Sequence, residues 1–328
     1  MTTRNVAIDV LKGGLVVLML ASHVVELLGD GREPAVLCGL SRAAELCCFS
    51  GFLFAFGYGS YISYFRTTTD APCGRIVKTA AKILVAFYIS GIARVFFHAE
   101  MGLDLKTLAD VLSLRRIPSY SEFLVTFALM ILSAAILFKP IKTVLSRPAT
   151  LFLLILGLLA TTFIPYDQVT NPHIGLLIGT AQSASYPAVQ YAPLFLLGMY
   201  FAKNDIRYSR AVLGVGGVLA AAFLLQYAFG AAPSRFPPSL TWILGSMAGV
   251  YLLFLFSLGI SRTPYCGRAL QVIGHNVLFY LVASNLVLFA VQAVHPRCHL
   301  GIGACLAFTA ALVAAIQAFI WMVRVPAG

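Results

Sequence analysis

The sequence predicts an all-α, polytopic membrane protein with about ten transmembrane helices and both termini in the cytoplasm. Of its 328 residues, 60% are hydrophobic and only 11% are charged, a balance typical of helical membrane proteins and unlike that of soluble domains. Apolar stretches long enough to cross a bilayer recur along the whole chain, so we expect residues 1–328 to form a single transmembrane domain.

The apolar stretches end at residues that break helices. Pro, Gly, Asn and Asp lie between them, as in segments 29–34, 171–172 and 233–238. In chain order, the predicted spans are 8–29, 41–64, 76–98, 121–138, 149–165, 187–202, 211–230, 240–260, 270–293 and 301–323. The fifth and sixth are short enough to be tilted or broken. The polar stretch 166–186 is expected to be a loop or a re-entrant segment that lines a cavity.

The distribution of basic residues predicts the orientation of these spans. Of the 23 Lys and Arg residues, fifteen fall on the side that holds the N-terminus and eight fall on the opposite side. Loops that remain in the cytoplasm collect Lys and Arg, so both termini are predicted to be cytoplasmic. The same bias explains the net charge of +11 without a nucleic-acid partner.

The first span carries four ionisable residues, Asp9, Lys12, His23 and Glu26. Eleven steps of about 100° separate Lys12 from His23, which makes three turns plus about 20° and puts both on one helix face, about 16 Å apart. Asp9 and Glu26 extend this face at its two ends. A charge in the middle of a bilayer costs roughly 3 kcal/mol on insertion scales, so the stripe is expected to line a protein cavity.

The positions of these four residues indicate their chemistry. Lys12, near the cytoplasmic surface, suits an anionic ligand such as a phosphate, with Asp9 beside it. His23 lies past the midplane and suits a general base, because its ordinary pKa is close to neutral. Glu26, one turn further on, could orient the imidazole or raise its basicity. The alternative is that Asp9 and Lys12 reach the membrane surface and that His23 is a hydrogen-bonded core residue.

A basic cluster opens the third span. Arg75, Lys78 and Lys82 are spaced by three and four residues and therefore share a helix face. Together with Lys12 they could hold the phosphates of a cytosolic cofactor. Alternatively, they are only the positive charges that mark cytoplasmic helix ends.

The second span begins with Arg42 and Glu45, three residues apart. They either pair with each other or face the cavity from its outer side. In the second case Arg42 is the best candidate to stabilise a developing oxyanion.

Further polar residues are predicted on the outer side. Arg94, Arg115 and Arg116 could hold a sugar or a lipid-linked acceptor, although a solvated loop explains them equally well. Arg235 and Ser239 precede the eighth span, where they either face the outer cavity or form the start of the helix, with Ser239 as its cap.

No metal site is expected. The seven cysteines show no paired spacing that would indicate a zinc or redox site. His295, Cys298 and His299 lie in one short outer loop without a nearby carboxylate.

Several of these segments resemble acyltransferase family 3, a family of integral-membrane acyltransferases that modify glycans and lipids. Its Arg/Lys-x10-His signature is similar to the first span, from Lys12 to His23. The segment 48–53 resembles its Phe-rich second-helix motif. Segments 75–83, 193–199 and 273–280 are similar to the family's third, late and penultimate helices. Residues 235–240 also resemble the heparan-glucosaminide N-acetyltransferase group.

The resemblance implies about ten helices, an acyl-CoA donor that enters from the cytoplasm and an acceptor reached from the outer side. It implies that His23 is the catalytic residue and that Lys12 is the donor-side cation. The chain departs from the pattern at Lys12, where Arg is more usual. It also departs at segment 121–124, where Trp-Phe is common, and at Ser284-Asn285, where a His is frequent.

The expected function is therefore acyl transfer in a membrane. An acyl group, expected to be acetyl, would move from cytosolic acyl-CoA to a glycan or glycolipid acceptor on the outer side, as in O-acetylation of a polysaccharide. The expected location is the bacterial inner (plasma) membrane, and the expected surroundings are the lipid bilayer. The alternative is a transporter or flippase of a polar or lipid-linked solute, because a charged stripe equally suits a permeation path.

Overall fold

The chain forms a bundle of helices in a computed structural model, which describes residues 5–30, 35–98, 104–179, 186–230, 232–295 and 299–324. The α-helices in these residues are α1 (Val6–Leu28), α2 (Ala35–Ser60), α3 (Cys73–Phe97), α4 (Leu105–Leu112), α5 (Glu122–Ile136), α6 (Phe138–Leu145), α7 (Pro148–Ala160), α8 (Pro172–Ile178), α9 (Ala188–Lys203), α10 (Arg210–Ala228), α11 (Leu240–Ile260), α12 (Cys266–His275), α13 (Val277–Val294) and α14 (Ile302–Arg324). A π-helical turn, Tyr61–Phe65, continues α2, and Thr161–Phe163 and Tyr166–Gln168 are 3-10 turns.

The helices identify a polytopic membrane protein. Within the described residues, seven are long and apolar enough to cross a bilayer, namely α1, α2 with its π-turn, α3, α10, α11, α13 and α14. Helices α5 and α6 would form an eighth span together, although they meet at an angle of 86°. Each of the ten predicted spans overlaps a helix. The ninth is divided between two helices, and three others, the fourth, fifth and sixth, do not form a single long helix.

These three differences have physical causes. The predicted fourth span, 121–138, is α5, which has only 15 residues because the chain bends at Leu137. Pro140, in the first turn of α6, has no N–H with which to continue the hydrogen bonding of α5. The predicted fifth and sixth spans correspond to α7 and α9, which have 13 and 16 residues. A straight span needs about 20 residues, so both are short for a full crossing.

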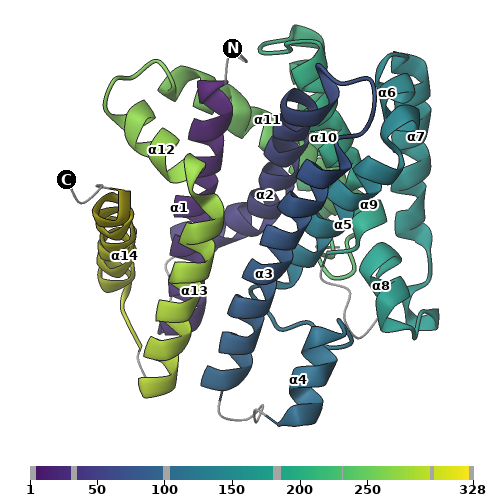
Figure 1. Cartoon of the computed structure of the whole chain (residues 1–328). Coiled ribbons are helices and arrows are strands. Elements are labelled where there is room, and N and C mark those ends of the chain that lie inside the picture. The colour runs from purple at the N-terminus through teal and green to yellow at the C-terminus, as the bar shows by residue number, and fades with distance from the viewer. Residues whose placement is uncertain are drawn as a thin grey trace.

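The predicted ninth span also needs a correction at its start. The chain breaks at Asn276, so residues 266–275 form the separate helix α12 and the long apolar helix α13 begins only at Val277. Helix α12 lies near the end of the bundle where α1 begins, whereas α4 lies at the opposite end (Figure 1). We call these the Asp9 end and the His23 end, after the residues of α1 that lie toward each.

Helix α1 is the centre of the fold and packs against α2, α11, α12, α13 and α14. Its crossing with α12 is very close, because a Cβ at Gly274 would lie 1.8 Å from the backbone oxygen of Asp9. A Cβ at Gly13 would likewise lie 2.0 Å from the backbone oxygen of Leu270. Glycines at helix crossings let backbones approach in membranes. This crossing fixes α12, and with it His275, against the first turns of α1.

Candidate functional site

A small polar cavity lies beside His23, in the half of the bundle toward the His23 end. Its volume is about 70 Å³, and its walls come from α1, α2, the start of α5 and two loops. The lining residues are Met19, Ser22, His23, Glu26, Ala44, Glu45, Cys48, Phe49, Phe52, Phe123, Tyr186 and Arg235. Charged groups thus gather between helices that are otherwise apolar, where they are expected to serve a function.

Arg235 is the cation of this cavity. Its Nη1 lies 3.2 Å from Oε1 of Glu45, and its Nη2 donates a 2.7 Å hydrogen bond to the hydroxyl of Tyr186. Burial raises the pKa of Tyr186 to about 12, so its phenol stays protonated at neutral pH. The guanidinium also stacks on Phe236 at 4.5 Å from the ring centre. Arg235 is therefore held in place by an acid, a phenol and a ring.

His23 is enclosed by side chains from two other parts of the chain. The ring of Tyr120 meets the imidazole edge-on, with centroids 5.0 Å apart, and the carboxamide of Asn285 lies next to it. Asn285 is fully buried and donates to Ser90 Oγ at 2.8 Å and to the backbone oxygen of Tyr120 at 3.0 Å. The Nδ1 atom of His23 is buried and has no hydrogen-bond partner in the part of the chain that the structure describes.

The backbone at Tyr120 is held in an unusual conformation. Its φ angle is 68°, in the left-handed region that bulky side chains rarely adopt. Such strain persists only where the surroundings impose it, and it is common at binding and active sites. Here the surroundings are the Asn285 amide, the edge of His23 and the ring of Phe289, whose centroid lies 5.8 Å from that of Tyr120. The strained turn therefore positions one wall of the histidine site.

A second polar layer lies behind Tyr120. Arg94 is 9% exposed, donates a 2.8 Å hydrogen bond to Gln292 and lies over the rings of Tyr120 and Phe289. The carboxylate of Glu26 faces the Tyr120 phenol. Glu26 is thus close to Tyr120 as well as to His23. The groups that flank the imidazole are Tyr120 and Asn285.

The Asp9 end of the stripe is a closed ion-pair cluster. The Asp9 side chain is 3% exposed, and its Oδ1 lies 2.7 Å from Lys12 Nζ. Its Oδ2 lies 3.0 Å from Nε2 of His275, which α12 brings to this point. A buried carboxylate with two partners is satisfied without a ligand. Lys12 and Asp9 therefore form a structural ion pair, in addition to any role in binding a donor.

The predicted donor cluster is not assembled. Arg75 lies over the ring of Tyr64 at 5.7 Å, and the side chains of Lys78 and Lys82 are exposed on α3. Helix α3 packs mainly against α5 and α13, whereas Lys12 pairs with Asp9 on α1 itself. Neither the cavity at His23 nor the larger cavities along α1 are lined by these four cations.

Arg42 needs a correction as the predicted oxyanion group. Its Nη1 donates to the hydroxyl of Tyr227 on α10, and its guanidinium lies over the same ring. Glu45, three residues after Arg42 on α2, points into the cavity and pairs with Arg235. Arg42 and Glu45 thus do not pair with each other, and the cation inside the cavity is Arg235.

Three predicted acceptor-side residues also lie outside the cavity. Arg115 is exposed, and Arg116 is 3.5 Å from the hydroxyl of Thr107 on α4. Ser239 accepts a 3.2 Å hydrogen bond from the backbone N–H of Trp242 and so caps α11. The capping role that the sequence allowed for Ser239 is therefore the one that the structure shows.

Two residues of the site, Tyr186 and Asn285, were not among the predicted site residues, whereas Glu45 lines the cavity, as one of its two sequence interpretations predicted. The signal for Asn285 was present, because it is a carboxamide in the middle of an apolar helix, and such polar residues usually have a function. Tyr120 and Tyr186 lie in loops, where sequence periodicity gives no position. Of the three residues His295, Cys298 and His299, for which no metal site was expected, Cys298 lies outside the described residues.

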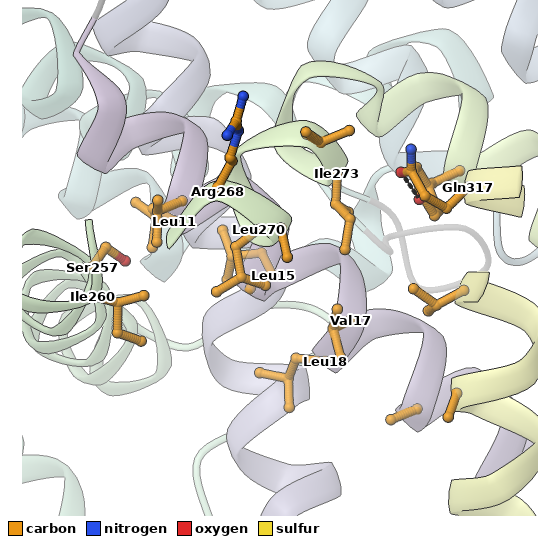
Figure 2. Close-up of a pocket in the computed structure, with 18 of the residues that line it drawn as sticks. Leu11, Leu15, Val17, Leu18, Ser257, Ile260, Arg268, Leu270, Ile273 and Gln317 are labelled. Carbon is orange, nitrogen blue, oxygen red and sulfur yellow. Dashed lines mark hydrogen bonds between the residues drawn. The ribbon is translucent and has the colours of Figure 1, made fainter. Parts of the chain in front are cut away.

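A large apolar cleft runs along α1 from the Asp9 end. Its volume is about 1160 Å³, and α1, α11, α12, α13 and α14 form its walls. Figure 2 shows Leu11, Leu15 and Leu18 of α1 on one wall, with Arg268 of α12 and Gln317 of α14 among the few polar groups. A smaller cavity shares Leu18 and Ala21 with this cleft and Ser22 with the cavity at His23. The three cavities therefore follow one another along α1.

Comparison of the chain with models of protein families, with curated proteins and with solved structures gives no match. The interpretation of the site therefore depends on its geometry and chemistry.

Proposed function

We propose that the chain is a membrane acyltransferase. It moves an acyl group, which we take to be acetyl, from cytosolic acyl-CoA to a hydroxyl of a glycan or glycolipid on the opposite side. His23 is the general base. The observation that carries this proposal is the buried Nδ1 atom of His23, which has no hydrogen-bond partner in the described residues although it adjoins a polar cavity. Buried polar atoms in folded proteins are almost always paired, so an acceptor hydroxyl is a suitable partner.

The residues of the cavity suit each step of such a transfer. The acceptor hydroxyl gives its proton to His23 as its oxygen forms a bond with the thioester carbonyl. Arg235 lines the same cavity and stabilises the negative charge on the carbonyl oxygen. The C–S bond then breaks, and the CoA thiolate takes the proton from the imidazolium. The carboxylate of Glu26 favours that imidazolium through its negative charge.

The proposed route of the donor follows the cavities along α1 and requires the middle one, which has a volume of about 10 Å³, to widen. The apolar cleft begins at the Asp9 end, which we propose faces the cytoplasm because of the charge bias. The pantetheine arm is long enough to pass about half of a 30 Å hydrocarbon layer. Ser22 lines both the small middle cavity and the cavity at His23. It is therefore a candidate to carry the acyl group in a transient acyl-enzyme. The proposal includes ten membrane segments, with α7 and α9 as short ones, in a bacterial inner membrane.

Acyl transfer and transport are distinguished by one assay. Purified protein is incubated with radiolabelled acetyl-CoA and membrane glycans, and both labelled product and free CoA are measured. We expect label in the glycan and an equal amount of free CoA. A solute flux into proteoliposomes without either product would favour the transporter instead.

A further inference from the structure

A second polar cavity lies at the Asp9 end, separate from the histidine site. Its volume is about 970 Å³, and it lies between the start of α1, the end of α2, the end of α9 and the end of α11. Its ionisable lining residues are Tyr58, Tyr61, Arg66, Lys203, Asp205, Arg207, Tyr208 and Arg262. Four cations therefore face one carboxylate around a single hollow.

Most of this positive charge has no ion-pair partner among the residues that the structure describes. Arg207 pairs only loosely with Asp205, at 3.4 Å and with both side chains about two-thirds exposed. Lys203 donates to the backbone oxygen of Leu145 and to Ser146, so it is fixed at the end of α6. In the part of the chain that the structure describes, Arg66 and Arg262 form no ion pair. Two guanidinium groups are thus left to bind an anion.

The local backbone is shaped around this cavity. The π-helical turn at the end of α2 carries Tyr61 and Ile62 into its wall, and Arg66 follows directly. Single π-helical turns are common at functional sites. Asp205 has a φ angle of 45°, in the left-handed region. The buried phenol of Tyr58 accepts a 2.7 Å hydrogen bond from Asn5 and closes the base of the cavity.

The cytoplasmic charge bias alone does not explain this arrangement. That bias needs basic residues only near helix ends, where they can point apart into water. Here the four cations come from three segments, namely the end of α2, the end of α9 with its following loop, and the end of α11, and they line one cavity although like charges repel. An anion in the cavity would remove this repulsion. Arg is also the side chain best suited to phosphate, because its planar fork binds two oxygens at once.

We propose that this cavity, with Arg66, Arg207 and Arg262 at its rim, binds the phosphate group of an organic phosphate. The site goes beyond the acyl transfer proposed above and does not depend on it. The phosphate could belong to a soluble nucleotide or to the headgroup of an anionic lipid, since the recognition chemistry is the same.

The test has two arms that separate these sources. In the first, ADP is titrated by calorimetry into protein held in phosphatidylcholine nanodiscs. In the second, native mass spectrometry measures how much phosphatidylglycerol the protein retains relative to phosphatidylcholine. The variants are Arg66→Gln with Arg262→Gln, and the matched control is Arg147→Gln, an exposed arginine at the start of α7.

We expect the wild type to bind ADP, phosphatidylglycerol or both, and to bind more weakly as salt is raised. The double Gln variant should lose about tenfold or more in affinity, because it removes the charged hydrogen-bond donors that would hold the phosphate. The Arg147→Gln control and a His23→Ala variant should bind like the wild type, so failure of this site is separable from failure of the acyltransferase proposal.

Two results would overturn the proposal. One is a wild type that binds neither ADP nor phosphatidylglycerol in preference to phosphatidylcholine. The other is a double Gln variant with wild-type binding. If the double variant does not fold, the proposal can still be tested on the wild type. Ligand binding to the wild type that does not weaken as salt is raised would contradict the proposal.

Discussion

At the scale of single residues, the placement of Arg235 changes how the site is understood. Two arginines that precede membrane helices, Arg42 and Arg235, were both candidates for the cavity from the sequence. The structure turns Arg42 to Tyr227 and places Arg235 between Glu45 and Tyr186. Sequence spacing shows which residues share a helix face, but it does not show which neighbour that face meets.

The two arginines give a matched pair of variants. Arg235→Gln removes the cation of the cavity and leaves Glu45 without its partner, so we expect acyl transfer to fall by about 100-fold or more, as for loss of an oxyanion group. Arg42→Gln should change the rate by less than about threefold, because exposed interactions contribute little. Initial rates of label transfer measure both. Equal losses in the two variants would show that Arg235 has no special role.

Asn285 is expected to support His23 through its own hydrogen bonds. Asn285→Ala leaves Ser90 and the backbone oxygen of Tyr120 without their donor, which costs about 1–3 kcal/mol of folding free energy. We expect a lower thermal midpoint in detergent and weaker activity. Asn276→Ala, at the junction of α12 and α13, is the control for loss of a carboxamide outside the site. Activity and stability both at the wild-type level in Asn285→Ala would contradict this role.

At the scale of elements, the close crossing of α1 and α12 decides where the first helix can lie. Gly274 has no room for a methyl group, because a Cβ would lie 1.8 Å from the backbone oxygen of Asp9. A Cβ at Gly14, on the same helix as Asp9, meets no atom within 4 Å. The crossing in turn holds His275 against the Asp9 carboxylate.

This difference predicts opposite effects of two alanine substitutions. Gly274→Ala must separate the helices and should destabilise the fold by about 1–3 kcal/mol or more. Gly14→Ala should be neutral or stabilising by up to about 1 kcal/mol, since alanine favours the helix. Unfolding in mixed detergent micelles, followed by circular dichroism, measures both. A Gly274→Ala variant as stable as Gly14→Ala would show that the crossing is looser than the structure has it.

The helices also show how much of the fold could be predicted from the sequence. Hydropathy located a helix at each of the ten predicted spans, because long apolar runs have few alternatives in a membrane. It did not find the break at Asn276 or the 86° bend between α5 and α6. These depend on tertiary contacts, as at Gly274, and on how a proline is accommodated. The site was likewise predicted only in part. The spacing in the first helix indicated His23, but the loops that contain Tyr120 and Tyr186 have no periodicity from which their positions could be predicted.

At the scale of the whole molecule, the proposed function requires the two ends of the bundle to face different compartments. Helix α6, with Lys139, lies toward the Asp9 end, and α4, with Lys106, lies at the His23 end (Figure 1). Single cysteines at these two positions, in a background with all seven native cysteines replaced by serine, report the orientation. We expect a membrane-impermeant maleimide to label position 106 in intact cells and position 139 only after the membrane is opened. Labelling of both from one side would contradict the orientation.

The central claim is that His23 accepts a proton from an acceptor hydroxyl on one side while the acyl donor arrives from the other. The most direct test uses proteoliposomes with the acceptor glycan trapped inside and radiolabelled acetyl-CoA outside. The wild type and a His173→Ala control, which changes a histidine of α8 that contacts the backbone oxygen of Ser113, should label the trapped glycan. The His23→Ala variant should insert and fold but transfer no label. Labelling by His23→Ala at the wild-type rate would contradict the account.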